Sequence, residues 1–155
     1  MAESYFVDSS ALVKRYVQED GTAWVRRLTR RSPGRRIYLA RITTVEVTAA
    51  VARRRKGRTL TAAKASSILY RFRQHLAGRY TLIDISPALL DDAMRLANAH
   101  ALRAYDAVQL AAALKIRREH QDFGFPPVTL ISADQALNDA ATAEGLAVDD
   151  PRSHP

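Results

Sequence analysis

Short runs of strand-forming residues alternate with longer helical runs along the whole chain. This alternation predicts an α/β domain with a mostly parallel sheet, because a helix between two strands lets the second strand run in the direction of the first. Five strands are predicted, at residues 5–7, 37–39, 80–83, 128–131 and 146–148. Helices are predicted at residues 9–17, 22–31, 43–56, 61–77, 87–100 and 105–120, and between Asp134 and Gly145.

The chain of 155 residues shows no internal linker, repeat or low-complexity segment, and this length suits one domain. We therefore expect a single domain over residues 1–148, followed by a short, frayed C-terminal tail at residues 149–155. The chain has no cysteine, which excludes disulfides, thiolate metal ligands and a cysteine nucleophile.

The chain carries 24 Lys and Arg residues against 16 Asp and Glu residues, a formal net charge of +8. A basic domain attracts polyanions, and nucleic acid is the commonest polyanion in a cell. A basic surface that serves only solubility has the same charge, so the charge indicates a class of partner and not an activity. The N-terminus lacks a signal-peptide pattern and no apolar run is long enough to cross a bilayer, so we expect a soluble, cytoplasmic protein without membrane contact.

Four acidic residues occupy positions from which their side chains can meet. Asp8 directly follows the first predicted strand, and Asp134 comes three residues after the end of the fourth. Glu46 and Asp106 lie in the first turns of predicted helices. In an open parallel sheet, ligands bind beyond the carboxyl ends of the strands, and a helix that follows a strand begins at that same edge. The four carboxylates are therefore predicted to converge on one crevice.

A cluster of four carboxylates repels itself unless a cation neutralises it. Oxygen-only ligands of this kind suit Mg²⁺ or Mn²⁺. A divalent ion bound there would acidify a water molecule and stabilise the charge that develops on a reacting phosphodiester. An acidic crevice on a basic protein is the electrostatic arrangement expected of a nuclease.

Helix capping is a competing explanation for each acid taken singly. Aspartate is a favoured N-cap residue, which would account for Asp8, Asp106 and Asp134. Thr43 and Glu46 match the S/T-x-x-E capping box. Only the convergence of all four acids on one edge of the sheet favours a shared site.

Four segments resemble the motifs of the PIN domain family, in particular of its VapC toxins. The first is Tyr5-Phe-Val-Asp8-Ser-Ser-Ala-Leu-Val-Lys-Arg-Tyr, and the second is Thr44-Val-Glu46-Val with Arg53-Arg54 downstream. The third is Leu102-Arg-Ala-Tyr-Asp106-Ala-Val-Gln-Leu-Ala-Ala-Ala-Leu, and the fourth is Ile131-Ser-Ala-Asp134. The resemblance spans about residues 5–148, with the motifs in the family's order and spacing.

The resemblance implies a PIN-like three-layer fold with about five mostly parallel strands flanked by helices. It also implies Mg²⁺- or Mn²⁺-dependent endonucleolytic cleavage of single-stranded RNA, inhibition by a cognate antitoxin, and assembly as a homodimer. The family's catalytic and metal-binding acids map onto Asp8, Glu46, Asp106 and Asp134.

The same resemblance assigns supporting roles to two serines. Ser10 and Ser132 would hydrogen-bond the carboxylates or metal-bound water, although ordinary helix-start chemistry explains Ser10 equally well. Tyr105 departs from the family, in which a small residue commonly precedes the third acid. This departure alters the pocket wall and leaves the expected metal ligands unchanged.

Several cations are candidates for phosphate contact. Arg103 precedes Asp106 by three residues and is predicted either to hold substrate phosphate or to pair with an acid. A run at a predicted helix C-terminus is a weaker RNA-binding candidate, since cations there also complement the helix dipole; it comprises Arg53, Arg54, Arg55 and Lys56. A second basic stretch is predicted to be a solvated face; it comprises Arg26, Arg27, Arg30, Arg31, Arg35 and Arg36.

Two other functions are compatible with the sequence. A catalytically silent PIN-like module would bind RNA or a protein partner without cutting, and the four retained acids argue against it. A receiver-like or phosphatase-like α/β domain would use Asp8 as a phospho-acceptor. That chemistry needs a second acid beside the first, and Ser9 and Ser10 follow Asp8 instead.

Overall fold

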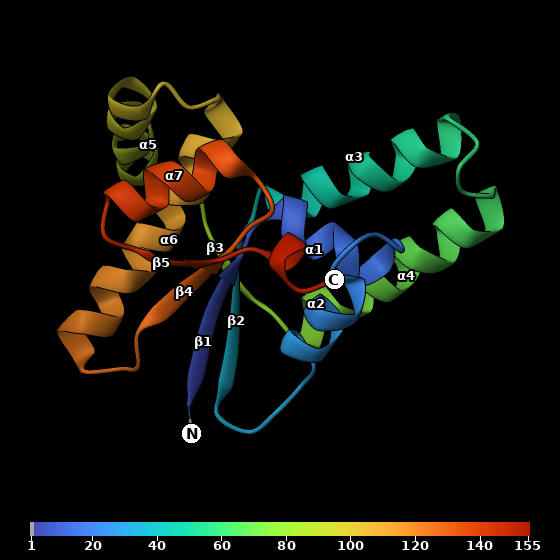
Figure 1. The fold of residues 1–155 in the computed structure, drawn as a ribbon, viewed down its shortest axis with the longest axis horizontal. Helices are drawn as coiled ribbons and strands as arrows, with labels where there is room; N and C mark the ends of the chain where they lie inside the picture. Colours follow the sequence, from blue (N-terminus) through green and yellow to red (C-terminus); the bar gives the residue numbers. More distant parts are fainter. Residues whose placement is uncertain (1) are drawn as a thin grey trace.

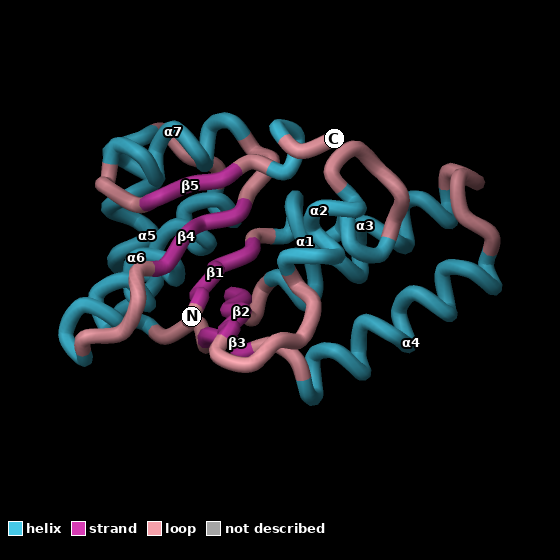
Figure 2. The backbone as a smooth tube through the Cα atoms, turned by 60° about the horizontal axis from the view of Figure 1, so that its bottom comes forward, coloured by secondary structure: helices cyan, strands magenta, loops and turns pink. Residues whose placement is uncertain are grey.

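Five parallel strands form one sheet in the computed structural model, which describes residues 2–155. The strands are β1 (Glu3–Val7), β2 (Arg35–Ala40), β3 (Thr81–Ile83), β4 (Val128–Ile131) and β5 (Ala147–Asp149). They lie in the order β3-β2-β1-β4-β5, and each neighbouring pair is parallel (Figure 2). The predicted α/β class with about five parallel strands is confirmed.

Helices cover both faces of the sheet. They are α1 (Ser9–Tyr16), α2 (Thr22–Leu28), α3 (Thr43–Lys56), α4 (Ala62–Gly78), α5 (Pro87–His100), α6 (Ala104–Phe123) and α7 (Gln135–Ala143), with a 3-10 helix at Pro151–Ser153. Figure 1 shows α5–α7 on one side of the sheet and α1–α4 on the other. The two groups of helices and the sheet between them make three layers.

The strands hold these layers together because their side chains alternate between the two faces. Phe6 and Leu130 belong to the apolar cluster that includes residues of α5, α6 and α7. Their neighbours Val7 and Ile131 belong to the cluster that includes residues of α1, α2, α3 and α4. A strand that is buried on both faces reads as a continuous apolar run, which is the pattern of a covered parallel sheet.

Strand β1 lies at the topological switch point of the sheet, where the strands that follow in the chain are added first on one side and then on the other. From β1 the chain continues through α1 and α2 to β2 on one side, whereas β4 pairs with β1 on the other side. Val7 lies opposite Ile131, and the Asp8 backbone N–H donates to the Ile131 carbonyl at 3.1 Å. The residues that follow β1 and β4 therefore lie side by side, at the place where open parallel sheets bind ligands.

The predicted fraying of residues 149–155 is wrong. Asp149 pairs with Ile131 in the sheet, Pro151 is buried, and the His154 ring stacks on Trp24 with 4.2 Å between ring centroids. Gly21, at the start of α2, has a φ of +87°, and a Cβ atom there would lie 2.5 Å from the Pro151 carbonyl oxygen. The short, polar segment has no hydropathy pattern of its own, and its order comes from the pairing of Asp149 with β4 and from contacts with α2.

None of the helices in residues 2–155 combines the length and apolar character needed to cross a lipid bilayer.

Candidate active site

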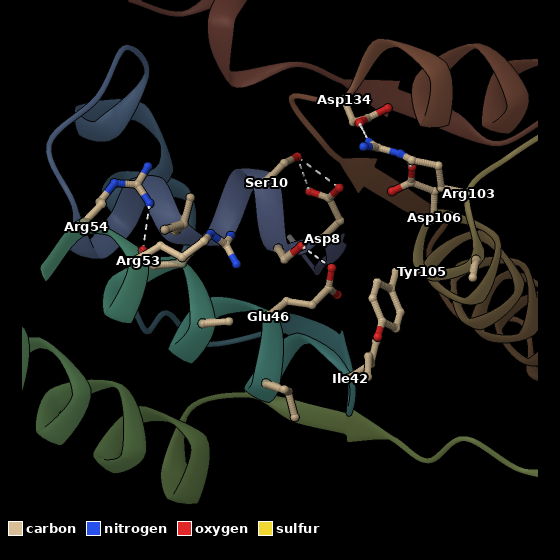
Figure 3. Close-up of a pocket in the computed structure, with 16 residues that line it drawn as sticks. Asp8, Ser10, Ile42, Glu46, Arg53, Arg54, Arg103, Tyr105, Asp106 and Asp134 are labelled. Carbon is tan, nitrogen blue, oxygen red and sulfur yellow. Dashed lines mark hydrogen bonds and ion pairs between the residues drawn. The ribbon is translucent and has the colours of Figure 1, made fainter. Parts of the chain in front are cut away.

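The four predicted acids line one cleft at the carboxyl edge of the sheet. The cleft has a volume of about 810 Å³, and Asp8, Glu46, Asp106 and Asp134 all contribute to its wall (Figure 3). Asp8 follows β1, Glu46 lies in the first turn of α3, Asp106 lies in the first turn of α6, and Asp134 precedes α7. Residues that are far apart in the sequence thus meet at the position that the strand-end rule predicts.

Asp8 is the most deeply buried of these acids, with 2% of its surface exposed. It caps α1 through a hydrogen bond from the Ala11 backbone N–H at 3.0 Å. Burial raises the pKa of Asp8 to about 7, a shift opposed by hydrogen bonds from Ser10, Ala11 and Ser132 and reinforced by the charge of Glu46. A nearby cation would favour the ionised form of this carboxyl group.

Ser10 and Ser132 hydrogen-bond Asp8 and connect it to the loop that follows β4. Ser10 Oγ donates to Asp8 Oδ1 at 2.7 Å and accepts from the Ala133 N–H at 3.0 Å. Ser132 Oγ donates to Asp8 Oδ2 at 2.9 Å and accepts from the Asp134 N–H at 3.1 Å. The two serines therefore orient Asp8 and fix the loop after β4 against the start of α1, as the resemblance implies for contacts with a carboxylate.

Glu46 is held by two residues that the sequence interpretation missed. Ser9 Oγ donates to Glu46 Oε2 at 3.0 Å, and Gln109 Nε2 donates to Glu46 Oε1 at 2.8 Å. Gln109 Nε2 also donates to Thr43 Oγ1 at 2.8 Å, so Thr43 and Glu46 share a partner on α6. Helix α3 has Ile42 as its N-cap and no side-chain cap, so the capping-box explanation of Glu46 is wrong.

Asp106 and Asp134 face each other across the side chain of Arg103, as Figure 3 shows. Arg103 Nε donates to Asp106 Oδ2 at 3.2 Å, and its Nη2 donates to Asp134 Oδ2 at 3.0 Å. Burial and the charge of Asp134 raise the pKa of Asp106, while Arg103 opposes the shift. Asp134 also caps α7 through the Leu137 N–H at 2.9 Å; Asp106 caps no helix, because α6 has Arg103 at its N-cap position.

The chemistry of these donors fits a hard divalent cation, because every candidate ligand is a carboxylate. Their spacing does not form a ready cage: in residues 2–155, no three Asp, Glu, His or Cys side chains lie close enough to hold one ion. Arg103 supplies the positive charge between Asp106 and Asp134, and 81% of its side chain is exposed. Such an exposed pair is weak, so Arg103 can give way to a stronger cation.

Only half of the basic run at the end of α3, residues 53–56, contributes to the wall of the cleft. Arg53 and Arg54 line it, whereas Arg55 and Lys56 are exposed and lie outside its wall. Arg54 forms an ion pair with Glu19 and donates to the Ala50 carbonyl at 3.3 Å, which leaves Arg53 as the freer of the two cations. Tyr105 also lines the cleft, with 60% of its surface exposed.

Several solved structures share this fold. FitAcB from Neisseria gonorrhoeae is 21% identical, with a TM-score of 0.60 over 97% of this chain and 99% of that one. VapBC2 from Rickettsia felis, bound to a DNA fragment from its promoter, is 14% identical, with a TM-score of 0.62 over 94% and 97%. A toxin–antitoxin complex from Klebsiella pneumoniae is 20% identical, with a TM-score of 0.60 over 96% and 98%. At these identities the likeness shows the fold.

The sequence itself shows the family. No curated protein matches the chain. The sequence pattern of the PIN domain matches residues 5–142, which include Asp8, Glu46, Asp106 and Asp134. The five-stranded parallel sheet between two helical layers confirms the predicted PIN-like architecture. By its sequence pattern and by its fold, this chain belongs to the PIN domain family.

Proposed function

We propose that this protein is an endoribonuclease that cleaves phosphodiester bonds of single-stranded RNA in the cytoplasm, with Mg²⁺ or Mn²⁺ as its cofactor. Membership of the PIN family supports the proposal. The observation that carries it is the meeting of four carboxylates in one cleft of a chain whose net charge is +8. A site built for a polyanionic substrate and a divalent cation needs both features.

Asp8, Glu46, Asp106 and Asp134 are the residues that would hold the cation. When bound, a divalent ion supplies Lewis acidity and lowers the pKa of a water molecule bound to it. The chain contributes fixed orientation: serines hold Asp8, and Ser9 with Gln109 holds Glu46. These contacts fix the orientation of Asp8 and Glu46 before reaction, whereas Asp106 and Asp134 must exchange Arg103 for the cation.

The rim of the cleft suits an unpaired nucleic acid strand. Arg53 provides a cation for a backbone phosphate beside the acids. Tyr105 offers an exposed aromatic ring in the same wall, and only an unpaired base presents its face for stacking on such a ring. These two residues support an unpaired nucleic acid strand as the substrate without indicating a sequence preference.

The phospho-acceptor alternative is disfavoured by the surroundings of Asp8. Both of its carboxylate oxygens accept hydrogen bonds, and the residue is buried. A phosphodonor would have to reach an oxygen that is already enclosed. A metal ligand, in contrast, can share an oxygen lone pair while these hydrogen bonds persist.

The cleavage experiment uses the purified chain and a fluorescently labelled single-stranded RNA. Cleavage is expected with Mg²⁺ or Mn²⁺ and is expected to stop when a chelator removes the metal. Asp106→Asn should lower the rate at least about 100-fold, because loss of a residue that only orients a metal ligand already costs about 10–100-fold. Asp92→Asn, which removes an exposed acid that pairs with Arg118, is the matched control and should retain the parent rate. Full activity of Asp106→Asn would end the nuclease proposal.

We further infer that the protein is a VapC-like toxin that forms a homodimer and is inhibited by a cognate antitoxin. The Klebsiella pneumoniae structure with this fold is a toxin–antitoxin complex. An inhibitor that inserts a cation between Asp106 and Asp134 would reproduce the pairs that Arg103 makes. It would also cover exposed apolar surface on α3 and α4, where Val45 and Tyr70 lie.

Co-expression tests the toxin assignment. The chain alone should arrest growth, and the product of the neighbouring upstream reading frame should relieve the arrest. Asp106→Asn should abolish the arrest without lowering the amount of soluble protein. Arrest of equal strength by Asp106→Asn would show that toxicity comes from binding or aggregation and not from cleavage. Size-exclusion chromatography with light scattering tests the homodimer.

A further inference from the structure

A second cleft lies on the helical layer formed by α1–α4, away from the four acids. It has a volume of about 360 Å³ and is lined by Arg15, Tyr16, Arg26, Arg30, Arg71 and His75. Helix α1 connects it to the first cleft, because Ser9 at the start of α1 lines one and Tyr16 at its end lines the other. At 1.5 Å per residue, the two ends of α1 are about 10 Å apart.

The cations of this cleft have no acidic partners. In the part of the chain that the structure describes, none of the four arginines forms an ion pair with a carboxylate, whereas Arg35, Arg54 and Arg103 each do. Arg15 Nη1 donates to the Arg26 carbonyl at 3.3 Å, and Arg26 Nε donates to the Arg15 carbonyl at 3.0 Å. These reciprocal bonds join α1 to α2 and hold two guanidinium groups near each other without neutralising them.

A hydrogen-bonded chain behind the arginines leaves a further donor on His75. Tyr16 Oη lies 2.6 Å from Tyr80 Oη and 2.7 Å from His75 Nδ1. Tyr80 is buried and Tyr16 is the partner of its hydroxyl, so the arrangement that satisfies both hydroxyls has Tyr80 donating to Tyr16 and Tyr16 donating to Nδ1. The neutral ring then carries its hydrogen on Nε2, where it can donate to a ligand.

The charge around His75 is consistent with an anion site. Burial, together with the charges of Arg79, Arg15 and Arg71, lowers the pKa of His75 to about 4. The imidazole is therefore neutral at physiological pH and serves as a hydrogen-bond donor, while the positive charge of the cleft comes from the arginines. Several guanidinium groups and a neutral N–H donor make a suitable environment for the oxygens of a phosphate group.

We propose that this second cleft binds a backbone phosphate of the RNA substrate, as an anchoring contact outside the catalytic cleft. The assignment to RNA rests on the proposed function. Because the two clefts lie at opposite ends of α1, an RNA strand long enough to span them over the surface would contact the acids and the arginines together. The second basic stretch, at residues 26–36, was predicted to be a solvated face; its Arg26 and Arg30 are exposed, and they also line this cleft.

The test measures RNA binding by fluorescence anisotropy in the Asp106→Asn background, which prevents cleavage. The test variant carries Arg26→Gln, Arg30→Gln and Arg71→Gln. The matched control carries Arg27→Gln, Arg31→Gln and Arg73→Gln, which lie on or beside the same helices, remove the same charge and lie outside the cleft wall. Binding to a single-stranded RNA long enough to reach both clefts should weaken at least tenfold more in the test variant than in the control. The slope of its salt dependence should also flatten by about 0.7 for each phosphate that the variant no longer binds.

Equal weakening in the two variants would overturn the proposal, since only net charge would then matter. If the test variant unfolds at a lower temperature than the control, the comparison is repeated with the single changes Arg71→Gln and Arg73→Gln, both at exposed positions on α4.

A second experiment adds inorganic phosphate to the protein and follows the NMR signals of the His75 ring. Tight binding of inorganic phosphate without any difference in RNA affinity would assign the cleft to a free phosphate group. If the test variant loses antitoxin binding while its RNA binding is unchanged, the second cleft binds an acidic protein and not RNA.

Failure of this site and failure of the nuclease proposal are distinguishable. With the four acids intact, the test variant should raise KM for a long RNA and leave kcat unchanged, because the arginines contact the substrate away from the reacting bond. If the parent chain cleaves RNA and the two variants have equal KM, the anchoring site fails and the nuclease stands. If the parent does not cleave RNA but the difference in RNA binding persists, the nuclease proposal fails and the anchoring site stands.

Discussion

The side chains of Asp8 and Ser132 are joined by a hydrogen bond of 2.9 Å, although 124 positions separate them in the sequence. The bond connects the residue after β1 to the residue after β4, and the pairing of Val7 with Ile131 brings these positions together. The orientation of the most buried acid in the cleft therefore depends on the central pairing of the sheet. The geometry of the acidic cleft and the pairing of β1 with β4 therefore depend on each other.

Burial of Asp8 predicts a pH-dependent stability of the metal-free protein. The pKa of Asp8 is about 7 in the folded state, against an ordinary value of 3.8 for the unfolded chain, so the unfolded chain loses this proton first as the pH rises. The free energy of unfolding should therefore fall between about pH 4 and pH 7, with an upper limit of about 4 kcal/mol from this group. Urea unfolding in the presence of a chelator, at pH 5, 6, 7 and 8, measures the slope.

Asp8→Asn removes this titration, so the decline in unfolding free energy with pH should become shallower. Asn retains an N-cap oxygen for the Ala11 N–H, which limits any structural loss at the start of α1. Asp122→Asn, at an exposed position on α6, is the control and should keep the parent slope. An unchanged slope in Asp8→Asn would contradict the assignment of this pH dependence to Asp8.

Removal of Arg103 should strengthen metal binding. Arg103 pairs with Asp106 and Asp134, so a divalent ion must compete with it for these acids. Arg103→Gln is expected to tighten the Kd for Mn²⁺ several-fold and to increase the rise in Tm that the metal produces. Calorimetric titration and thermal melts measure both effects. Arg118→Gln removes another exposed arginine that pairs with an aspartate and should behave as the parent. Weaker Mn²⁺ binding in Arg103→Gln would show that Arg103 supports the metal site.

Loss of Gln109 should disturb Glu46 and the start of α3 together. The Gln109 amide is buried and donates to both Thr43 and Glu46, so its removal leaves two acceptors without a donor. Gln109→Met, which keeps a similar volume, should lower the free energy of unfolding by about 1–3 kcal/mol and also reduce RNA cleavage. Gln135→Met, at an exposed position on α7, should change neither. Parent-like cleavage in Gln109→Met would show that Glu46 does not need this contact.

Substitution of two glycines distinguishes the stability that comes from contact with the C-terminal segment from the cost of backbone strain alone. Gly21 and Gly124 both have positive φ, at +87° and +69°, but a Cβ atom would meet Pro151 at Gly21 and nothing within 4 Å at Gly124. Gly124→Ala should cost about 1 kcal/mol, from the left-handed conformation alone. Gly21→Ala should cost clearly more, because Pro151 must also move away. Chemical denaturation measures the difference, and equal losses would mean that residues 150–155 contribute little to stability.

Local sequence signals predicted most of the fold. Helix α5 begins at Pro87, after Ser86 as its N-cap, and α3 ends at Lys56 before Gly57, both as expected from capping chemistry. Strand β4 also has its predicted bounds, because its apolar run is flanked by polar or turn residues. The order of residues 150–155 could not be predicted, since it comes from a stacked ring and a close approach to α2 that no local pattern encodes.

One rule of topology made part of the candidate site predictable from the sequence. The strand-end rule brought the four acids to one edge, but it could not identify their partners. Ser9 contacts Glu46 across 37 positions, and Gln109 contacts it across 63. Gln109 was recognisable only as a polar residue inside an apolar helical run, which indicates a buried hydrogen bond without naming its partner. The arginine cleft likewise depends on the packing of α1, α2 and α4.

The central position of β4 has a consequence for how the protein is made. A ribosome adds residues from the N-terminus, so Asp8, Glu46 and Asp106 are synthesised before the strand that must lie beside β1. Until residues 128–134 emerge, Asp8 lacks Ser132, the cleft lacks Asp134, and one edge of β1 is unpaired. Translation products that stop before β4 thus carry three of the acids without an assembled cleft, and all four acids can share one cleft only after residues 128–134 have been made.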